Sequence, residues 1–121
     1  MTMSENNFFT SIQQNFKLIS LKGEFLGGDK IEALSNYLKN EAKLEPKNAI
    51  IDLSGVTFLN SMALGVLLSV NAVFHKEGGN VVLANPSSYL KNIFATTKLD
   101  LIFKIEQSIE DAMAALNKIT A

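Results

Sequence analysis

Residues 50–69, IIDLSGVTFLNSMALGVLLS, constrain the fold of this chain more than any other stretch. The apolar run at residues 49–53 is bounded by polar residues and Gly55, as expected of a central strand that is buried on both faces. Residues 56–59 lead on to Asn60 and Ser61, two residue types that often cap the start of a helix. Residues 62–74 then have the composition of a largely apolar helix. We therefore expect a buried strand that delivers the chain, through a short connection, to the N-terminus of a helix.

The start of this helix is suited to carry an anion on Ser61. The first amides of a helix lack partners inside the helix, and the helix dipole is positive at this end. A phosphate attached to the Ser61 hydroxyl would meet both. Taken alone, however, the pair Asn60-Ser61 is more often a cap and nothing else. Both interpretations stay open at this point, because one hydroxyl can cap a helix and also accept a phosphate.

Four positions around Ser61 have expected local roles. Leu64 is expected in the core, whereas Met62 is expected at the rim of the site, where a flexible thioether adapts to a partner. Gly65 is expected to let the helix pack closely on the sheet, because glycine inside a helix otherwise costs about 1 kcal/mol relative to alanine. Asp52 is expected to hydrogen-bond the turn that follows its strand.

Apolar runs that alternate with amphipathic segments along the rest of the chain predict an α/β fold. The sheet is expected to be mixed and mostly parallel, with about five strands and about four helices. Expected strands are residues 8–12, 16–22, 49–53, 81–84 and 101–105, of which the first two form a hairpin around residues 13–15. The other three helices are expected to start at residues 27–29, at residues 85–87 and at Ser108, and the second of these runs to about Thr96.

The spacing of apolar residues predicts which side of each helix is buried. In the first helix these residues are Ile31, Leu34, Leu38 and Ala42. In the last helix, where Ser108 and Asp111 resemble a capping box, they are Ile109, Met113, Leu116 and, as a further candidate, Ile119. The helix at residues 62–74 is apolar around more than one stripe, which favours a partner on part of its surface.

Length and charge bound the function classes. The 121 residues are expected to form a single domain, residues 1–121, with a flexible N-terminus at residues 1–7. The charge is −1, with 11 basic and 12 acidic residues interspersed, so no polyanion or membrane surface is indicated as a partner. All the basic residues are lysine, and the lack of an arginine fork argues against direct binding of nucleic acid. Cysteine is absent, so disulfides and thiolate metal sites are excluded.

Neither catalysis nor membrane insertion is indicated. The first seven residues lack a signal-peptide pattern and no apolar stretch approaches the roughly 20 residues that span a bilayer, so a cytoplasmic location is expected. The only histidine, His75, lies at the far end of the helix that Ser61 begins, about 20 Å away at ~1.5 Å per residue. Phosphate-binding glycine motifs and metal-ligand clusters are also missing, so we expect no enzyme activity, no cofactor and no metal.

The central segment resembles the signature of the STAS domain and, within that family, of the bacterial anti-sigma factor antagonists, whose usual form is D-L-S-x-V-x-F-x-D-S-S-G-L-G-V-L-L. The matching positions are Asp52, Leu53, Ser54, Val56, Phe58, Ser61 and residues 64–68. Three positions depart from this form: Asn60 replaces Asp, Met62 replaces a second Ser or Thr, and Ala63 replaces Gly. The resemblance extends more loosely to residues 21–26 and 78–83.

The resemblance implies a function for Ser61. In that family the serine after the acidic position is phosphorylated, so Ser61 is the implied phosphoacceptor. The unmodified protein would bind an anti-sigma factor with serine kinase activity, which releases a sigma factor, and a serine phosphatase would restore binding after phosphorylation. The implied partner-binding residues are Asn60, Ser61, Met62, Ala63 and Leu64. Asp52, Ser54 and Gly65 are implied as residues that support the site.

Two alternatives remain at this stage. One is a STAS module that binds constitutively within a larger signalling or transport assembly, with Ser61 unmodified. The other is a receiver-like domain that is phosphorylated on Asp52. The receiver alternative lacks two usual features, since Lys22-Gly23-Glu24 stands in place of an acidic pair and no Lys-Pro pair follows the last strand.

Overall fold

The computed structural model describes residues 7–120, so the expected flexible segment, residues 1–7, lies outside the described residues except for Asn7. The strands are β1 (Phe8–Ile12), β2 (Lys17–Phe25), β3 (Ala49–Leu59), β4 (Val81–Ala84) and β5 (Lys104–Glu106). The helices are α1 (Gly28–Ala42), α2 (Ser61–Lys76), α3 (Ser88–Thr96) and α4 (Ile109–Thr120), with a 3₁₀ turn, η1 (Leu99–Leu101), before β5. The expected α/β fold with five strands and four helices is confirmed over these residues.

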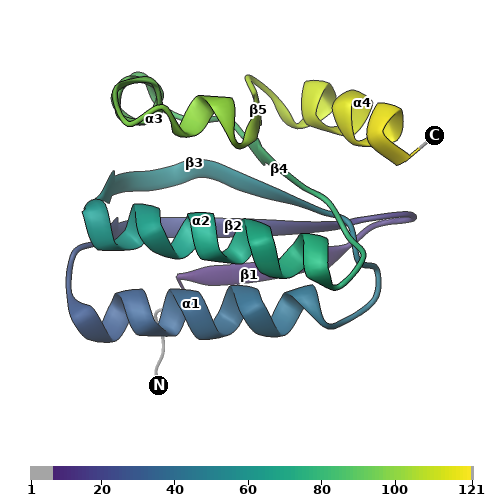
Figure 1. The fold of residues 1–121 in the computed structure, drawn as a ribbon, viewed down its shortest axis with the longest axis horizontal. Coiled ribbons are helices and arrows are strands. Elements are labelled where there is room, and N and C mark those ends of the chain that lie inside the picture. The colour runs from purple at the N-terminus through teal and green to yellow at the C-terminus, as the bar shows by residue number, and fades with distance from the viewer. Residues whose placement is uncertain (1–6, 121) are drawn as a thin grey trace.

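The five strands form one sheet in the order β1-β2-β3-β4-β5 (Figure 1). The hairpin pair β1 and β2 is antiparallel, and the other three pairs are parallel. The expected mixed, mostly parallel sheet is therefore confirmed. Because β2, β3, β4 and β5 run in one direction, each segment between them must return the chain from the C-terminal end of one strand to the N-terminal end of the next, and α1, α2 and α3 are these crossovers.

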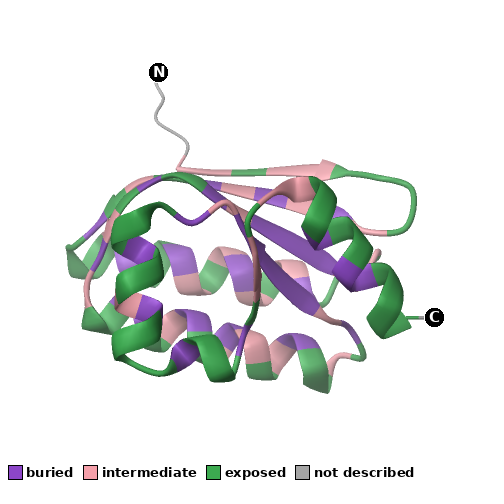
Figure 2. Ribbon diagram, turned by 90° about the horizontal axis from the view of Figure 1, so that it is seen from above, coloured by how far each residue is buried: buried purple, intermediate pink, exposed green. Residues whose placement is uncertain are grey.

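Three helices cover one face of the sheet and form the main core. Side chains from β2, β3 and β4 on this face pack against α1, α2 and α3, and Figure 2 marks the buried residues of these strands and helices in purple. In α1 the buried residues are Ile31, Leu34, Leu38 and Ala42, which confirms the stripe expected from the sequence. Packing of α2 on this face of the sheet therefore fixes the position of α2 and of its first residue, Ser61.

Among the described residues, α4 is the one helix on the other face, where it lies over β3, β4 and β5. Ala112 and Leu116 of α4 pack against Ile50, Val82 and Ala84 of the sheet, and the partly buried Ile109 packs against the same cluster. Met113 and Ile119 are 40% and 45% exposed, so the buried stripe expected from the sequence is wrong at these two positions. Met113 lies beside the buried side of α4 and lines a hollow with Phe16, whereas Ile119 lies in the last turn of the helix, beyond the buried Leu116.

The expected strand at residues 101–105 is also displaced. β5 covers Lys104–Glu106, whereas Leu101 and Ile102 lie at or just after η1 and are 79% and 53% exposed. Lys98 precedes η1 with a left-handed φ of 64°, which turns the chain out of α3. Phe103 is the residue that returns to the core, where its ring lies 6.5 Å from that of Phe94.

β3 continues well beyond the expected end at residue 53. Gly55 does not stop the strand, because β3 pairs with β2 as far as Leu59, with shifts of register along the way. A Cβ at Gly55 would lie 2.9 Å from the Leu21 carbonyl oxygen, so only glycine fits this close approach of the two strands. This extension leads the chain to Asn60, so that α2 starts directly after the C-terminal end of the long strand β3.

Candidate functional site

Asn60 is the residue that fixes the start of α2. Its Oδ1 accepts a hydrogen bond of 2.9 Å from the Ala63 amide, so Asn60 is the N-cap. Its Nδ2 donates to the Leu26 carbonyl oxygen at 3.0 Å, and its backbone amide donates to the Phe25 carbonyl oxygen at 3.3 Å. The last two bonds join the start of α2 to the end of β2 and the connection that follows it.

Ser61 is the first residue of α2, not its cap, and it is exposed. Within residues 7–120 its hydroxyl has no hydrogen-bond partner, because Asn60 already caps the helix. The amides of Ser61 and Met62 likewise find no acceptor among these residues. A free hydroxyl thus stands beside two free amides at the positive end of a helix, which suits a negatively charged substituent.

The expected partner-binding residues divide into two groups. Asn60, Ser61 and Met62 reach the surface, and Met62 is 62% exposed, at the rim as expected. Ala63 and Leu64 are buried in the main core, so the expectation that they contact a partner directly is wrong. They face inwards because they lie on the stripe of α2 that packs on the sheet.

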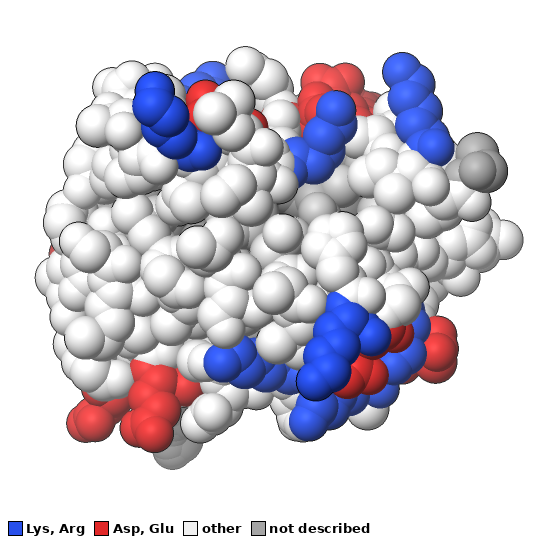
Figure 3. Space-filling model, in the orientation of Figure 1, with Lys and Arg blue, Asp and Glu red and all other residues white. Residues whose placement is uncertain are grey.

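The solvent side of α2 is an uncharged surface. Residues 61–75 contain no Asp, Glu or Lys, and Figure 3 shows the middle of this face without charged side chains. Gly65 lies on this side, where a Cβ would meet no other atom within 4 Å. The expectation that Gly65 permits close packing on the sheet is therefore wrong. Gly65 is exposed together with Met62 and Leu68 on this uncharged side of α2, beside Ser61.

One aromatic contact near the site was not foreseen from the sequence. Tyr89, at the start of α3, stacks on Phe58 with ring centroids 5.4 Å apart, and Phe58 lies two residues before Asn60. Tyr89 remains 41% exposed and lines a shallow, mostly apolar hollow of about 230 Å³ with Ile93. The only available sequence signal was an aromatic residue in the first turn of a helix, which by itself indicates no site.

Asp52 and Ser54 lie away from Ser61. Asp52 Oδ1 accepts a hydrogen bond of 3.0 Å from the Ser54 amide. This is the local bond expected from the sequence, but both residues lie within β3 and not in a turn after it. Asp52 Oδ1 also accepts a hydrogen bond of 3.3 Å from Asn85 Nδ2, which follows β4. Six to eight residues of strand separate them from Asn60, roughly 20–26 Å at ~3.3 Å per residue. They support β3 and β4 without touching Ser61.

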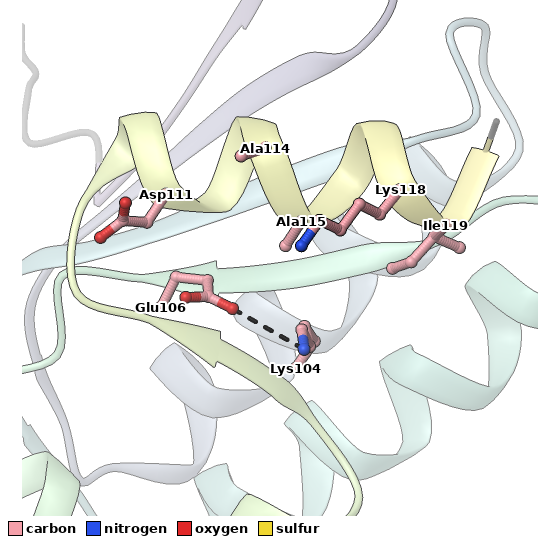
Figure 4. Close-up of a pocket in the computed structure, with 7 residues that line it drawn as sticks. All are labelled: Lys104, Glu106, Asp111, Ala114, Ala115, Lys118 and Ile119. Carbon is pink, nitrogen blue, oxygen red and sulfur yellow. Dashed lines mark ion pairs between the residues drawn. The ribbon is translucent and has the colours of Figure 1, made fainter.

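A second hollow lies on the opposite face of the sheet. It measures about 370 Å³ between β5 and α4, and Figure 4 shows Lys104, Glu106, Asp111 and Lys118 around it. Lys104 and Glu106 form a loose ion pair of 3.9 Å whose side chains are partly exposed. Within residues 7–120 no group of three or more potential metal ligands comes together, and no helix combines the length and apolarity needed to span a bilayer.

Comparison with known proteins assigns the family. Residues 8–112 match the STAS domain. This chain belongs to the STAS domain family. A STAS-domain containing protein of Pseudomonas aeruginosa is 30% identical over 87 residues, which cover 72% of this chain and 84% of that protein.

Solved structures share the STAS fold. TM1081 of Thermotoga maritima has a TM-score of 0.81 at 22% identity, with 91% of this chain and 94% of that chain covered. The Bacillus anti-sigma factor antagonist SpoIIAA, in its unphosphorylated form, has a TM-score of 0.73 at 18% identity and coverage of 92% and 96%. The STAS domain of a SulP transporter from Vibrio cholerae has a TM-score of 0.72 at 19% identity and coverage of 91% and 88%. STAS domains of this shape thus occur in antagonists and in transporters.

Proposed function

We propose that this STAS protein is an anti-sigma factor antagonist that is switched off by phosphorylation of Ser61. The observation that carries the proposal is the free, exposed hydroxyl of Ser61 at the first position of α2, next to an uncharged surface. Unmodified protein would bind an anti-sigma factor with serine kinase activity, and a serine phosphatase would reverse the modification. In this scheme the protein is a substrate and a ligand, not an enzyme, and acts in the cytoplasm.

A phosphate on Ser61 would change binding without a change of fold. It adds about −1.5 to −2 charges and three acceptor oxygens at a surface that otherwise carries no charged side chain. The free amides of Ser61 and Met62 would hold the phosphate where it stands. A partner that covers α2 must then desolvate this charge, a cost that grows as the interface becomes drier.

The chain contains a matched control for the experiment. Ser88 is also the exposed first residue of a helix, α3, and the preceding Ser87 caps that helix through a 3.1 Å bond from the Leu90 amide. We would purify wild type, Ser61→Ala and Ser88→Ala from the native cells and analyse each by intact-mass and fragment mass spectrometry. Phosphate on wild type and Ser88→Ala, but not on Ser61→Ala, is the expected result.

Binding is tested with charge substitutions at the same two serines. Once the cognate anti-sigma factor is in hand, Ser61→Glu is expected to weaken binding by at least about tenfold, whereas Ser88→Glu leaves it within about twofold. Ser61 that stays unmodified throughout growth and stress, together with equal binding of both glutamate variants, would overturn the proposal.

A second candidate function is a constitutive STAS module in a larger signalling or transport assembly. The similarity to a transporter STAS domain favours it, as do the departures at Asn60, Met62 and Ala63 from the antagonist signature. The same experiment separates the two, because a constitutive module would carry no phosphate on Ser61 and would bind its partner equally at all growth stages. A receiver-like role for Asp52 ranks below both, since Asp52 Oδ1 is already bonded to Ser54 and Asn85.

A further inference from the structure

The two edges of the sheet differ in how well they are protected against pairing with another strand. β5 is three residues long and carries Lys104 and Glu106, and short, charged edge strands resist association. β1 is five residues long, FFTSI, and residues 8–16 contain no charged residue, no proline and no glycine. Within residues 7–120 no strand lies outside β1, which runs along one border of the molecule (Figure 2).

The hydrogen-bond register shows which groups of β1 are open. Lys22 N–H donates to Asn7 O, and Gln13 N–H donates to Phe16 O, at the two ends of the ladder with β2. Because hydrogen-bonded and non-hydrogen-bonded pairs alternate in an antiparallel ladder, the odd-numbered residues of β1 bond to β2. The amides and carbonyls of Phe8, Thr10 and Ile12 therefore point outwards.

These outward groups are self-complementary under a two-fold axis. A second β1 placed antiparallel, with the axis at Thr10, brings Phe8 opposite the second copy's Ile12, Thr10 opposite its own equivalent, and Ile12 opposite the second copy's Phe8. Each of these three pairs exchanges two backbone bonds, which makes six in all. The symmetry closes the contact, because the same patch is used on both copies.

The side chains along β1 favour the same pairing. Ile12 is 63% exposed and would lie beside the Phe8 ring of the second copy, which is held by stacking on Tyr37 at 4.9 Å. Phe9, on the other face of the sheet, is 66% exposed and would lie diagonally across from its equivalent. The pairing thus removes two of the most exposed apolar side chains from water and leaves no charge buried.

We propose that this chain forms a symmetric dimer in which the β1 strands of two copies pair antiparallel about Thr10. The proposal does not rest on the function of Ser61, which lies on α2, outside the contact. One strand pair with few flanking contacts is a small interface, so the dimer is expected to depend on concentration across the micromolar range.

The first test compares two charge substitutions at exposed apolar residues. Sedimentation velocity of the full chain across a wide range of concentrations should show a monomer–dimer equilibrium. Ile12→Lys is expected to raise the dissociation constant by at least about tenfold, because the ammonium would lie beside the second copy's Phe8. Leu101→Lys makes the same chemical change at a more exposed residue far from β1, and is expected to leave the constant within about twofold. Circular dichroism would show that both variants are folded.

The second test checks the register. The chain has no cysteine, so Thr10→Cys and Ile12→Cys each introduce a single thiol. Opposed Cα atoms of a hydrogen-bonded pair lie about 5.5 Å apart, within reach of a disulfide, whereas two copies of residue 12 would be offset by four residues. Mild oxidation should crosslink Thr10→Cys at least about tenfold faster than Ile12→Cys. A wild type that stays monomeric at high concentration, equal effects of the two lysine variants, or equal crosslinking at residues 10 and 12 would overturn the proposal.

Discussion

Replacing Asn60 with alanine removes two hydrogen bonds of different kinds from the start of α2. The first is the N-cap bond from the Ala63 amide to Oδ1, and the second is the bond from Nδ2 to the Leu26 carbonyl oxygen. Loss of an N-cap side chain costs about 1 kcal/mol, and loss of an ordinary hydrogen bond costs about 1 kcal/mol. Asn60→Ala is therefore expected to lower the free energy of unfolding by about 2 kcal/mol.

Two comparison variants separate these contributions. Ser87→Ala removes only a cap bond, that of α3, and is expected to cost about 1 kcal/mol. Asn60→Asp restores the residue of the usual antagonist signature and keeps the cap. The carboxylate gains about 0.5 kcal/mol from the helix dipole, but it cannot donate a hydrogen bond to the Leu26 carbonyl oxygen. The expected cost of this variant, about 0.5 kcal/mol, lies well below that of Asn60→Ala.

Urea unfolding followed by circular dichroism measures all three variants. Hydrogen exchange at the Ile31 amide, which donates to the Gly27 carbonyl oxygen, adds a local readout of this loop, because the loop is tied to α2 by the Nδ2 bond that both Asn60 variants lose. Exchange there should quicken in Asn60→Asp and Asn60→Ala and stay unchanged in Ser87→Ala. An Asn60→Ala variant that loses no more stability than Ser87→Ala, with unchanged exchange in the loop, would refute the bridging role of Asn60.

Three further substitutions test the packing described above, each by urea unfolding. Lys17→Met is expected to cost about 3 kcal/mol, because the buried Nζ bonds the Leu44 carbonyl oxygen and pairs with the Glu41 carboxylate, and both would lose this partner; a loss below about 1 kcal/mol would contradict this. Gly65→Ala should stabilise the fold by about 1 kcal/mol, since the added methyl group meets no atom, and a destabilisation would show that the surface is more crowded than described. Gly79→Ala should instead cost more than about 2 kcal/mol, because its Cβ would clash with the Lys47 carbonyl oxygen, and near-neutral stability would contradict that contact.

Features set by local periodicity were predictable from the sequence. The α1 stripe, the hairpin of β1 and β2, and the order of strands and helices all follow from spacings within one segment. The end of α2 was also predictable from local sequence, since Gly78 adopts a φ of 89°, a conformation that favours glycine. The resemblance to the STAS signature then supplied the fold as a whole, which the family match confirms.

Features set by contacts between distant segments were not predictable. Nothing near Gly55 in the sequence shows that β3 continues past it, because the reason is the carbonyl of Leu21 on the neighbouring strand. The division of roles between Asn60 and Ser61 is similar. Both residue types cap helices, and the sequence near them does not show that Asn60 also donates through Nδ2 to the carbonyl oxygen of Leu26, more than thirty residues earlier.

The uncharged surface of α2 has a kinetic consequence. Without charges to attract a partner from a distance, association through this face is expected at about 10⁵–10⁶ M⁻¹s⁻¹, with little dependence on salt. Differences in affinity among partners would then arise mainly from how slowly each complex dissociates. A phosphate on Ser61 would introduce the first long-range field on this surface, so the modified and unmodified forms should differ in the salt dependence of association as well as in affinity.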